Sequence, residues 1–388
     1  MSYEIKRLSA GDMENLAAML NISFTGDSHS RHFEDGLPKM WVADDEYMSH
    51  NIALIEDGEI AAVTGMYPYE VSIAGKLLRF ATVGNIAVLP QHRGKGYMQL
   101  LVETAMHDLQ EQNIDVSRLG GLRSRYEIYG YEPAGTNYTV LLTERNAKEA
   151  EAREGSKAIT FVKVESTDTE FLTFIRELYE QNLIHVKRGS DRDLYATLCA
   201  WSHIPYVAVC DGQPIGYLCA TKDGTAIAEH KGITPEENAA MLYQWVLQSS
   251  ADYVRFAVYP WDHALCSVLS RVCEALTAEA ATHFKVLNWE RMVEAVLTLK
   301  ASVLPIPDGR LLLGIIDYGT LEMVKEGDTV RVTRCADTAD ITLDKLTATR
   351  FLFGMLPPQL VAALPEDKSR LITAWFPLPM SWNGQDRV

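Results

Sequence analysis

Long apolar runs are missing from this sequence. No stretch of the 388 residues approaches the ~20 consecutive apolar residues that a membrane-spanning helix requires. The opening residues Met1–Arg7 lack the apolar core of a secretion signal and instead favour a strand. We therefore expect a cytoplasmic protein with no membrane span, whose N-terminal residues belong to the fold.

Cysteine is also scarce, and its spacing indicates little chemistry. All six cysteines lie after residue 198. None forms a CxxC pair and no histidine cluster has metal-ligand spacing, so the sequence indicates neither a metal site nor a disulfide framework. The expected buried free thiols are Cys199, Cys210, Cys219, Cys266, Cys273 and Cys335.

Positive charge is in short supply. Lys and Arg number 36 against 52 Asp and Glu, which gives a formal net charge of -16. This balance disfavours nucleic acid as a partner, because phosphate contacts need a positive field. It suits a cationic small molecule that a negative cleft can steer, although the same acidity can serve solubility alone.

What the sequence does contain is the composition of a globular protein, with 47% hydrophobic and 23% charged residues. Its length predicts two or three domains. Asp57-Gly58 between two apolar runs predicts a hairpin, and apolar residues at helical spacing predict an amphipathic helix over 97–112. Together these patterns indicate an α/β domain that ends near residue 150. The other expected elements are a helix at 12–20 and strands at 3–8, 51–56, 59–66, 69–73, 77–80, 82–89, 115–120 and 138–143.

The same order of elements returns in residues 151–285, after a charged segment at 147–154 that resembles a linker. A DG turn at 211–212 joins apolar runs at 205–209 and 214–221, and a strand at 227–230 precedes a helix at 236–248. The turn before that helix, Lys231–Asn238, has one glycine and two acids, so it lacks the features of an anion site. The second half therefore reads as a degenerate copy of the first.

Residues 286–388 form a different, small α+β module. The apolar segment Trp375–Trp382 favours an ordered chain end, the alternative being a frayed tail. The expected helices are 287–300 and 344–353, and the expected strands are 311–318, 320–325, 329–334 and 371–377.

A basic, glycine-rich turn, Gln91-His-Arg-Gly-Lys-Gly96, joins the strand at 82–89 to the helix at 97–112. The N-terminus of a helix presents backbone N–H groups without an internal partner and the positive end of the helix dipole, so it attracts anions. Gly94 and Gly96 let the backbone approach an oxygen closely. The turn does not match the P-loop pattern. An anion site is the functional interpretation, and a plain strand-to-helix turn is the alternative.

This turn resembles the acetyl-CoA signature of the GNAT N-acetyltransferases. The segment Ser124-Arg-Tyr-Glu-Ile-Tyr-Gly-Tyr-Glu-Pro-Ala134 is similar to a motif of the Eis-like (enhanced intracellular survival) members, with Tyr129 where the family usually has Phe. The resemblance implies a mixed α/β fold. Its parts would be an acetyl-CoA-binding GNAT domain (1–150), a degenerate GNAT-like domain (151–285) and a sterol-carrier-protein-like domain (286–388) whose C-terminus reaches the active site.

The resemblance also assigns roles to residues of this chain. Tyr126 would donate a proton to the departing thiolate, and the terminal carboxylate of Val388 would serve as the base. Spacing alone would make Tyr126 a core tyrosine. The acetyl-CoA contacts would be Ile86, Ala87 and Val88 for the pantetheine, Gly94, Lys95, Gly96, Tyr97, Met98 and Gln99 for the pyrophosphate, and Gly121 and Leu122 near the thioester.

The acceptor pocket is harder to predict. Aromatic faces and carboxylates are what a polycationic amine would meet, and the loop between residues 24 and 42 offers Phe24, Asp27 and Trp41. Asp386, close to the chain end, is a further candidate for holding a cationic group. The alternative is a solvated loop with a few anchoring aromatics.

These features predict an N-acetyltransferase that transfers acetyl from acetyl-CoA to an amine of a small, polycationic acceptor such as an aminoglycoside or polyamine, without a metal. One alternative is acetylation of a protein lysine or N-terminus. The other is a non-catalytic CoA- or lipid-binding protein. The family resemblance alone also implies a homo-oligomer, and specifically a hexamer.

Overall fold

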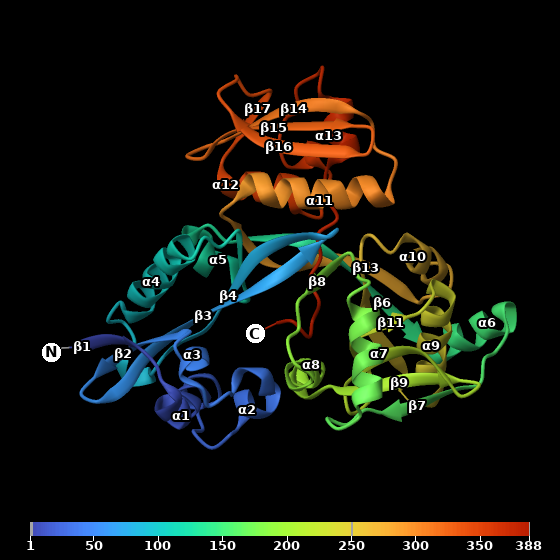
Figure 1. Ribbon diagram of the computed structural model, residues 1–388, viewed down its shortest axis with the longest axis horizontal. Helices are drawn as coiled ribbons and strands as arrows, with labels where there is room; N and C mark the ends of the chain where they lie inside the picture. The colour runs from blue at the N-terminus through green and yellow to red at the C-terminus, as the bar shows by residue number, and fades with distance from the viewer. Residues whose placement is uncertain (1–2, 250, 388) are drawn as a thin grey trace.

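The computed structural model describes residues 3–249 and 251–387. Figure 1 shows three lobes, with the N-terminal residues at the lower left, the middle of the chain at the lower right and the C-terminal module above them. The chain end, marked C, lies between the two lower lobes.

Residues 3–131 form a curved sheet flanked by helices. The strands are β1 (Tyr3–Arg7), β2 (Asn51–Glu56), β3 (Glu59–Ile73), β4 (Lys76–Val88) and β5 (Val116–Leu119). The helices are α1 (Met13–Thr25), α2 (His32–Gly36), α3 (Asp45–Met48), α4 (Tyr97–Glu111) and α5 (Arg123–Tyr126), with short 3-10 turns η1 (Ala10–Asp12), η2 (Pro38–Met40), η3 (Pro90–His92) and η4 (Glu127–Tyr129).

The middle of the chain repeats this layout. Its strands are β6 (Glu132–Thr143), β7 (Ile159–Lys163), β8 (Ile184–Val186), β9 (Ile204–Cys210), β10 (Gln213–Ala220), β11 (Ala226–Gly232), β12 (Tyr253–Val258) and β13 (Ala275–Val286). Its helices are α6 (Glu144–Glu154), α7 (Thr169–Tyr179), α8 (Asp191–Leu198), α9 (Pro235–Gln248) and α10 (His263–Leu269), with the 3-10 turn η5 (Ala200–Ser202).

The C-terminal module stacks a small sheet on a long helix (Figure 1). The helix is α11 (Trp289–Val303), and the sheet has the order β16 (Thr329–Cys335), β15 (Gly319–Glu326), β14 (Gly309–Ile315), β17 (Ile341–Leu343). The remaining elements are α12 (Lys345–Phe353), η6 (Pro358–Leu360) and α13 (Ser369–Trp375).

Two expectations about local structure are wrong. The predicted strand at 371–377 is instead helix α13, because its buried residues Ile372 and Trp375 recur at a spacing of three, which is one helical face. The predicted linker at 147–154 belongs to helix α6, whose Ala147 and Ala150 are fully buried while its charged residues face outward.

The two lower lobes share one continuous sheet. In the described part of the chain it has thirteen strands, in the order β1-β2-β3-β4-β5-β13-β6-β12-β11-β10-β9-β7, with β8 paired to β3. Strand β13 comes from the middle of the chain but pairs with β5, whereas β6 pairs with β12 of the second lobe. The sheet therefore crosses the expected boundary at residue 150, and the division into three domains stays a prediction.

The segment after α13 runs through the middle of the molecule. Trp382 is 3% exposed and stacks on Phe80 of β4, with ring centroids 5.7 Å apart and planes at 17°. The guanidinium of Arg118 on β5 lies 5.6 Å from the Trp382 ring centroid. The expectation of an ordered chain end is therefore confirmed as far as Asp386, which is also buried.

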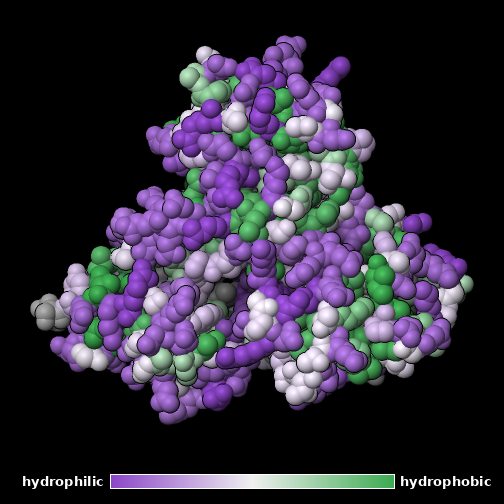
Figure 2. Space-filling view, in the orientation of Figure 1, coloured by the Kyte–Doolittle hydropathy of each residue, from purple (hydrophilic) through white to green (hydrophobic). Residues whose placement is uncertain are grey.

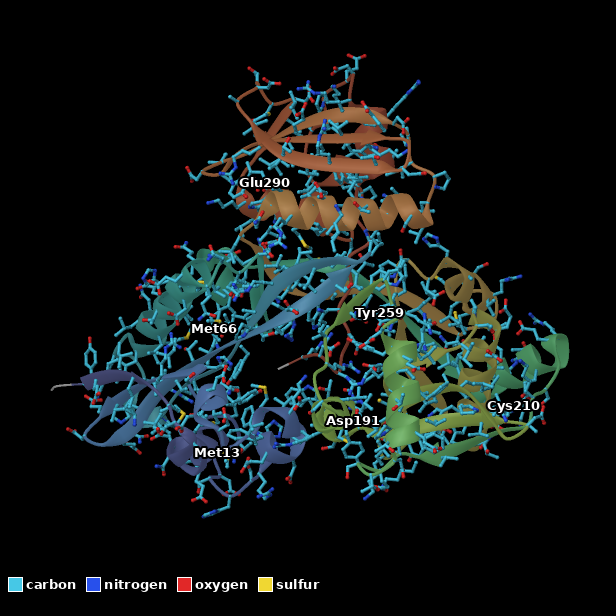
Figure 3. The ribbon with its side chains drawn as sticks, viewed as in Figure 1. Met13, Met66, Asp191, Cys210, Tyr259 and Glu290 are labelled. Atoms are coloured by element: carbon cyan, nitrogen blue, oxygen red, sulfur yellow. The ribbon has the colours of Figure 1, made fainter. Side chains whose placement is uncertain are left out.

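A buried ion network fastens this segment to the second lobe. Arg188 donates to both carboxylate oxygens of Glu229 (2.8 and 2.5 Å) and, at 3.1 Å, to Asp386. Tyr179 donates to the other oxygen of Asp386 at 2.8 Å, and Asn383 donates to Glu229 at 2.7 Å and to the hydroxyl of Tyr259, labelled in Figure 3, at 2.9 Å. The chain end is therefore held by charges that are removed from water.

We predict that Trp382→Ala lowers the free energy of unfolding by about 3 to 5 kcal/mol, the usual cost of truncating a buried tryptophan. Urea titration followed by circular dichroism measures this loss. Trp201→Ala is the matched control, because Trp201 is 38% exposed, and its cost should stay below about 1 kcal/mol. Equal losses in the two variants would contradict a tightly packed tail.

Candidate active site

Strands β4 and β5 stop pairing at a β-bulge in β4. Their parallel pairing ends at Val83 and Leu119, while β4 continues to pair with β3 as far as Val88. At Asn85 the backbone has a φ of 52°, and the β3–β4 register shifts there. The stretch of β4 after Val83 therefore has one backbone edge that does not pair with β5, which makes its amides and carbonyls available to a ligand.

The bulge is held in place by side chains from two other strands. Asn85 donates to the hydroxyl of Tyr67 at 2.6 Å, and Tyr67 donates to the side-chain carbonyl of Asn51 at 2.5 Å. Burial raises the pKa of the Tyr67 phenol well above its ordinary value, so this group stays protonated and remains a donor. The three residues fix a left-handed backbone conformation that asparagine tolerates better than most residues.

Helix α4 begins directly after the glycine turn, and its N-terminus is open. Gly96 is the N-cap residue with a φ of 80°, no side chain of the described chain caps the helix, and its first turn carries no acid. Gly94 has the same φ. The first N–H groups of the helix and its positive dipole end therefore face outward, as an anion site requires.

The corresponding helix of the second lobe is closed to anions. The Thr234 hydroxyl accepts from the Glu237 N–H at 3.1 Å, and the Glu237 carboxylate accepts from the Thr234 N–H at 3.1 Å. This capping box satisfies the helix end, and Glu236 and Glu237 place negative charge there. The second lobe thus keeps the shape of the turn without its anion-binding chemistry.

A buried carboxylate holds two basic side chains of the glycine turn. One oxygen of Glu56, whose side chain is 1% exposed, lies 2.7 Å from both Lys95 Nζ and His92 Nδ1. Lys95 therefore points toward the protein. Its predicted contact with the pyrophosphate would therefore come from the backbone N–H, because the ammonium is held by Glu56.

The bulge and the turn border one cleft of about 530 Å³. Seven of the residues predicted to contact acetyl-CoA line it, together with the exposed Arg93 and Arg125, two guanidinium groups suited to phosphate oxygens. The predicted residues are Ile86, Ala87, Val88, Gly94, Gly96, Tyr97 and Met98.

Three other predicted contacts lie outside the lining of this cleft. Gln99 donates to Glu103 one helical turn along α4. Gly121 and Leu122 follow β5 and are both exposed. Gly121 lies under the ring of Tyr126, since a Cβ at that position would be 2.7 Å from the ring.

Tyr126, the predicted proton donor, ends helix α5 beside the cleft-lining Arg125. Its side chain is 5% exposed and packs in the core under α4. Burial raises the pKa of its phenol, while the bond with Arg125 acts in the opposite direction. The group is therefore protonated at neutral pH.

The predicted acceptor residues do not meet in one pocket. Phe24 is 57% exposed and lines the 530 Å³ cleft. Asp27 caps its own turn by accepting from the His29 N–H at 2.9 Å, and Trp41 packs at the edge of the N-terminal core. Asp386 lines a different cavity, and both its carboxylate oxygens are engaged by Arg188 and Tyr179.

Val388, the predicted base, lies outside the described residues. The last described residue, Arg387, donates to the backbone carbonyl of Ala281 at 3.2 Å. The surface is hollowed between the two lower lobes (Figure 2).

Sequence reasoning missed Glu56, the Tyr67–Asn51 support of the bulge, and Arg125. Glu56 follows an apolar run and precedes Asp57-Gly58, so it reads as the polar end of a hairpin strand. Only the fold brings it under the turn near residue 95. Arg125 sits within the quoted motif at 124–134, and its charge next to Tyr126 was an available signal.

Comparison with known proteins agrees with this geometry. Residues 4–134 match the family model of the acetyltransferase (GNAT) domain. A GCN5-related N-acetyltransferase from Anabaena variabilis shares the fold at a TM-score of 0.70 and 15% identity, over 98% of this chain and 99% of that one. The corresponding enzyme from Kribbella flavida gives 0.69 and 14% over 98% of both chains. Eis1 from Mycobacterium abscessus gives 0.66 and 18% over 99% of both.

No protein with a curated description matches the sequence. Residues 4–134 nonetheless match a GNAT acetyltransferase domain, which makes the N-terminal lobe an acyltransferase-type domain. The fold of the chain extends over nearly the full length of Eis1, so the resemblance to Eis-like enzymes and the mixed α/β fold class are confirmed.

No helix of residues 3–249 and 251–387 combines the length and apolar composition needed to cross a membrane. Within the same residues, no group of three or more His, Cys, Asp and Glu side chains is arranged to hold a metal ion.

We predict that Arg93→Ala raises the Kd for acetyl-CoA about tenfold, the loss of one charge-assisted hydrogen bond to a phosphate. Isothermal titration calorimetry measures the change, and the difference should shrink at high salt. Arg145→Ala is the control, because Arg145 lies on α6 with its side chain 86% exposed. An unchanged Kd for Arg93→Ala would contradict phosphate binding at this turn.

Proposed function

We propose that this protein is an N-acetyltransferase that transfers acetyl from acetyl-CoA to the amine of a small molecule. The open N-terminus of helix α4 supports this proposal above all, since it borders the same 530 Å³ cleft as the bulged edge of β4. An anion site and a free strand edge together suit a cofactor that carries phosphates and amide groups. Two proteins of similar fold, from Kribbella flavida and Anabaena variabilis, are GCN5-related N-acetyltransferases.

The cleft residues would divide the work of binding. The exposed edge of β4 at Ile86, Ala87 and Val88 would pair with the amides of the pantetheine arm. The N–H groups around Gly96, with Arg93 and Arg125, would hold the phosphates. The thioester would then lie near the point where β4 and β5 separate, within reach of an acceptor that arrives from the other side of the bulge.

Acetyl transfer needs a neutral amine, a stabilised oxyanion and a protonated leaving thiolate. The amine nitrogen bonds to the thioester carbon, the carbon–sulfur bond breaks, and the sulfur takes up a proton. Tyr126 would supply that proton, because its phenol is protonated at neutral pH and Arg125 beside it lines the cleft. The role of Val388 as base stays a prediction.

The proposed function is tested by release of free CoA from acetyl-CoA, with aminoglycosides, linear polyamines, amino acids and lysine peptides as acceptors. We expect turnover with at least one class of small amine and none with peptides. Turnover confined to lysine peptides would favour protein acetylation instead. Failure to bind acetyl-CoA would overturn the proposal.

We predict that Tyr126→Phe lowers kcat about 100-fold, since a positioned general acid contributes 10²–10⁴-fold. The Kd for acetyl-CoA should stay within about twofold, because the phenol acts on the leaving group and not on binding. Tyr129→Phe is the matched control, three residues away and half-buried. If both variants retain wild-type kcat, the proton comes from another group.

A further inference from the structure

A second cavity, here called the Lys39 pocket, lies across the bulge from the acetyl-CoA cleft. It has a volume of about 330 Å³, and its walls include Lys39, Tyr47, Tyr67, Tyr69, Arg188 and Asp386. Tyr67 links it to the cleft, because its hydroxyl accepts from Asn85 at 2.6 Å and Asn85 precedes the cleft-lining Ile86. This hydrogen bond therefore connects the linings of the two cavities at the point where β4 and β5 separate.

The ammonium of Lys39 has no acidic partner within the described chain. It donates to the backbone carbonyl of Gln385 at 2.6 Å, and no carboxylate of the described residues lies within ion-pair distance. Burial lowers the pKa of Lys39 to about 7, against the opposing attraction of Asp386. A half-buried cation that contacts only a carbonyl is open to an anion from outside.

The carboxylates of the same pocket are already engaged. Asp386 accepts from Arg188 and Tyr179, and Arg188 also binds Glu229 through both of its outer nitrogens. Asp193 is exposed at the mouth and accepts from the Ser190 hydroxyl at 2.9 Å. The pocket therefore offers no buried carboxylate to a second cation.

A second cation lies behind the pocket wall. Arg118 is 1% exposed and donates to the Thr82 hydroxyl at 3.3 Å, which Tyr69 of the pocket also contacts at 3.1 Å. Its Nε has no hydrogen-bond partner, and no carboxylate of residues 3–249 and 251–387 pairs with it. Lys39 and Arg118 are therefore two basic side chains of this region without a carboxylate partner among the described residues, whereas Arg188 pairs with Glu229 and Asp386.

We propose that the acceptor is an amine that also carries a carboxylate, and that Lys39 binds this carboxylate. The inference rests on the proposed function and names the acceptor class. A polycation would bring a further positive charge beside Lys39 and Arg118 in a region partly removed from water, where like charges repel strongly. A carboxylate would instead favour the protonated form of Lys39 and pair with it, and this charge-assisted bond would orient the amine toward the bulge.

The experiment compares acceptor pairs that differ by one carboxylate: lysine with cadaverine, ornithine with putrescine, and phenylalanine with phenethylamine. CoA release is measured for the wild type and for Lys39→Gln, Lys39→Arg and Lys187→Gln. Lys187 lines the same pocket but is ion-paired with Glu70 at 3.4 Å and 55% exposed, so it controls for a lost surface charge.

We expect kcat/KM of the wild type to be at least tenfold higher for the carboxylated member of the best pair. Lys39→Gln should raise KM for that member about tenfold or more and leave its decarboxylated partner within twofold. Lys39→Arg should retain most of the preference, because it keeps the charge, and Lys187→Gln should behave like the wild type.

The proposal is overturned if every decarboxylated amine is the better acceptor, or if Lys39→Gln impairs both members of a pair equally. The latter result would mean that Lys39 acts only on the chain, through Gln385. If Lys39→Gln does not fold, calorimetry of wild-type protein with CoA and either member of a pair decides by their relative Kd. Turnover of other amines alone would reject this acceptor class, whereas absence of acetyl-CoA binding would reject the proposed function itself.

Discussion

The separation of β4 from β5 at Asn85 is the constraint on which both cavities depend. A continuous parallel pair would use every backbone amide within the sheet and leave no edge for a ligand. The extra residue at the bulge ends that pairing while β3 still holds β4 in place. Because Tyr67 supports the bulge from the opposite side, the same hydroxyl also forms a wall of the Lys39 pocket. One hydrogen-bonded group therefore supports the strand edge that lines the 530 Å³ cleft and also lines the Lys39 pocket.

The two lobes differ in how the turn before the long helix ends, and this difference decides whether the turn can bind an anion. Helices α4 and α9 both follow a strand and both pack on the sheet, yet only α4 leaves its first N–H groups free. Gly96 contributes no side chain, whereas Thr234 and Glu237 satisfy each other and the helix end. A helix without a side-chain N-cap is less stable by on the order of 1 kcal/mol. Helix α4 of the first lobe lacks such a cap, and helix α9 of the second lobe has one. The second lobe instead contributes stability, through the Arg188–Glu229 pair that holds the chain end.

The sequence was sufficient to predict those features that are local in the chain. The hairpin at Asp57-Gly58, the turn at 91–96 and helix α4 follow from turn chemistry and periodicity, and the seven cleft residues follow from the family motif. The two wrong predictions of local structure were decided by packing. Buried alanines make the predicted linker at 147–154 part of helix α6. The buried face of Ile372 and Trp375 makes the predicted strand at 371–377 a helix. The ion pair between Glu56 and Lys95 could not be predicted, because strands β3 and β4 separate the two residues in the chain and no sequence pattern links them.

The sequence also could not predict which charges line the Lys39 pocket, because these charges come from segments far apart in the chain. A net charge of -16 suggested an acidic pocket, but net charge describes the whole surface and not one cavity. In the folded chain Asp386 is neutralised by Arg188, while Lys39 and Arg118 face the middle of the molecule without a carboxylate among the described residues. Desolvation makes these few buried charges count for more than the many exposed ones. The net charge of the whole chain therefore does not predict which charged groups line the Lys39 pocket.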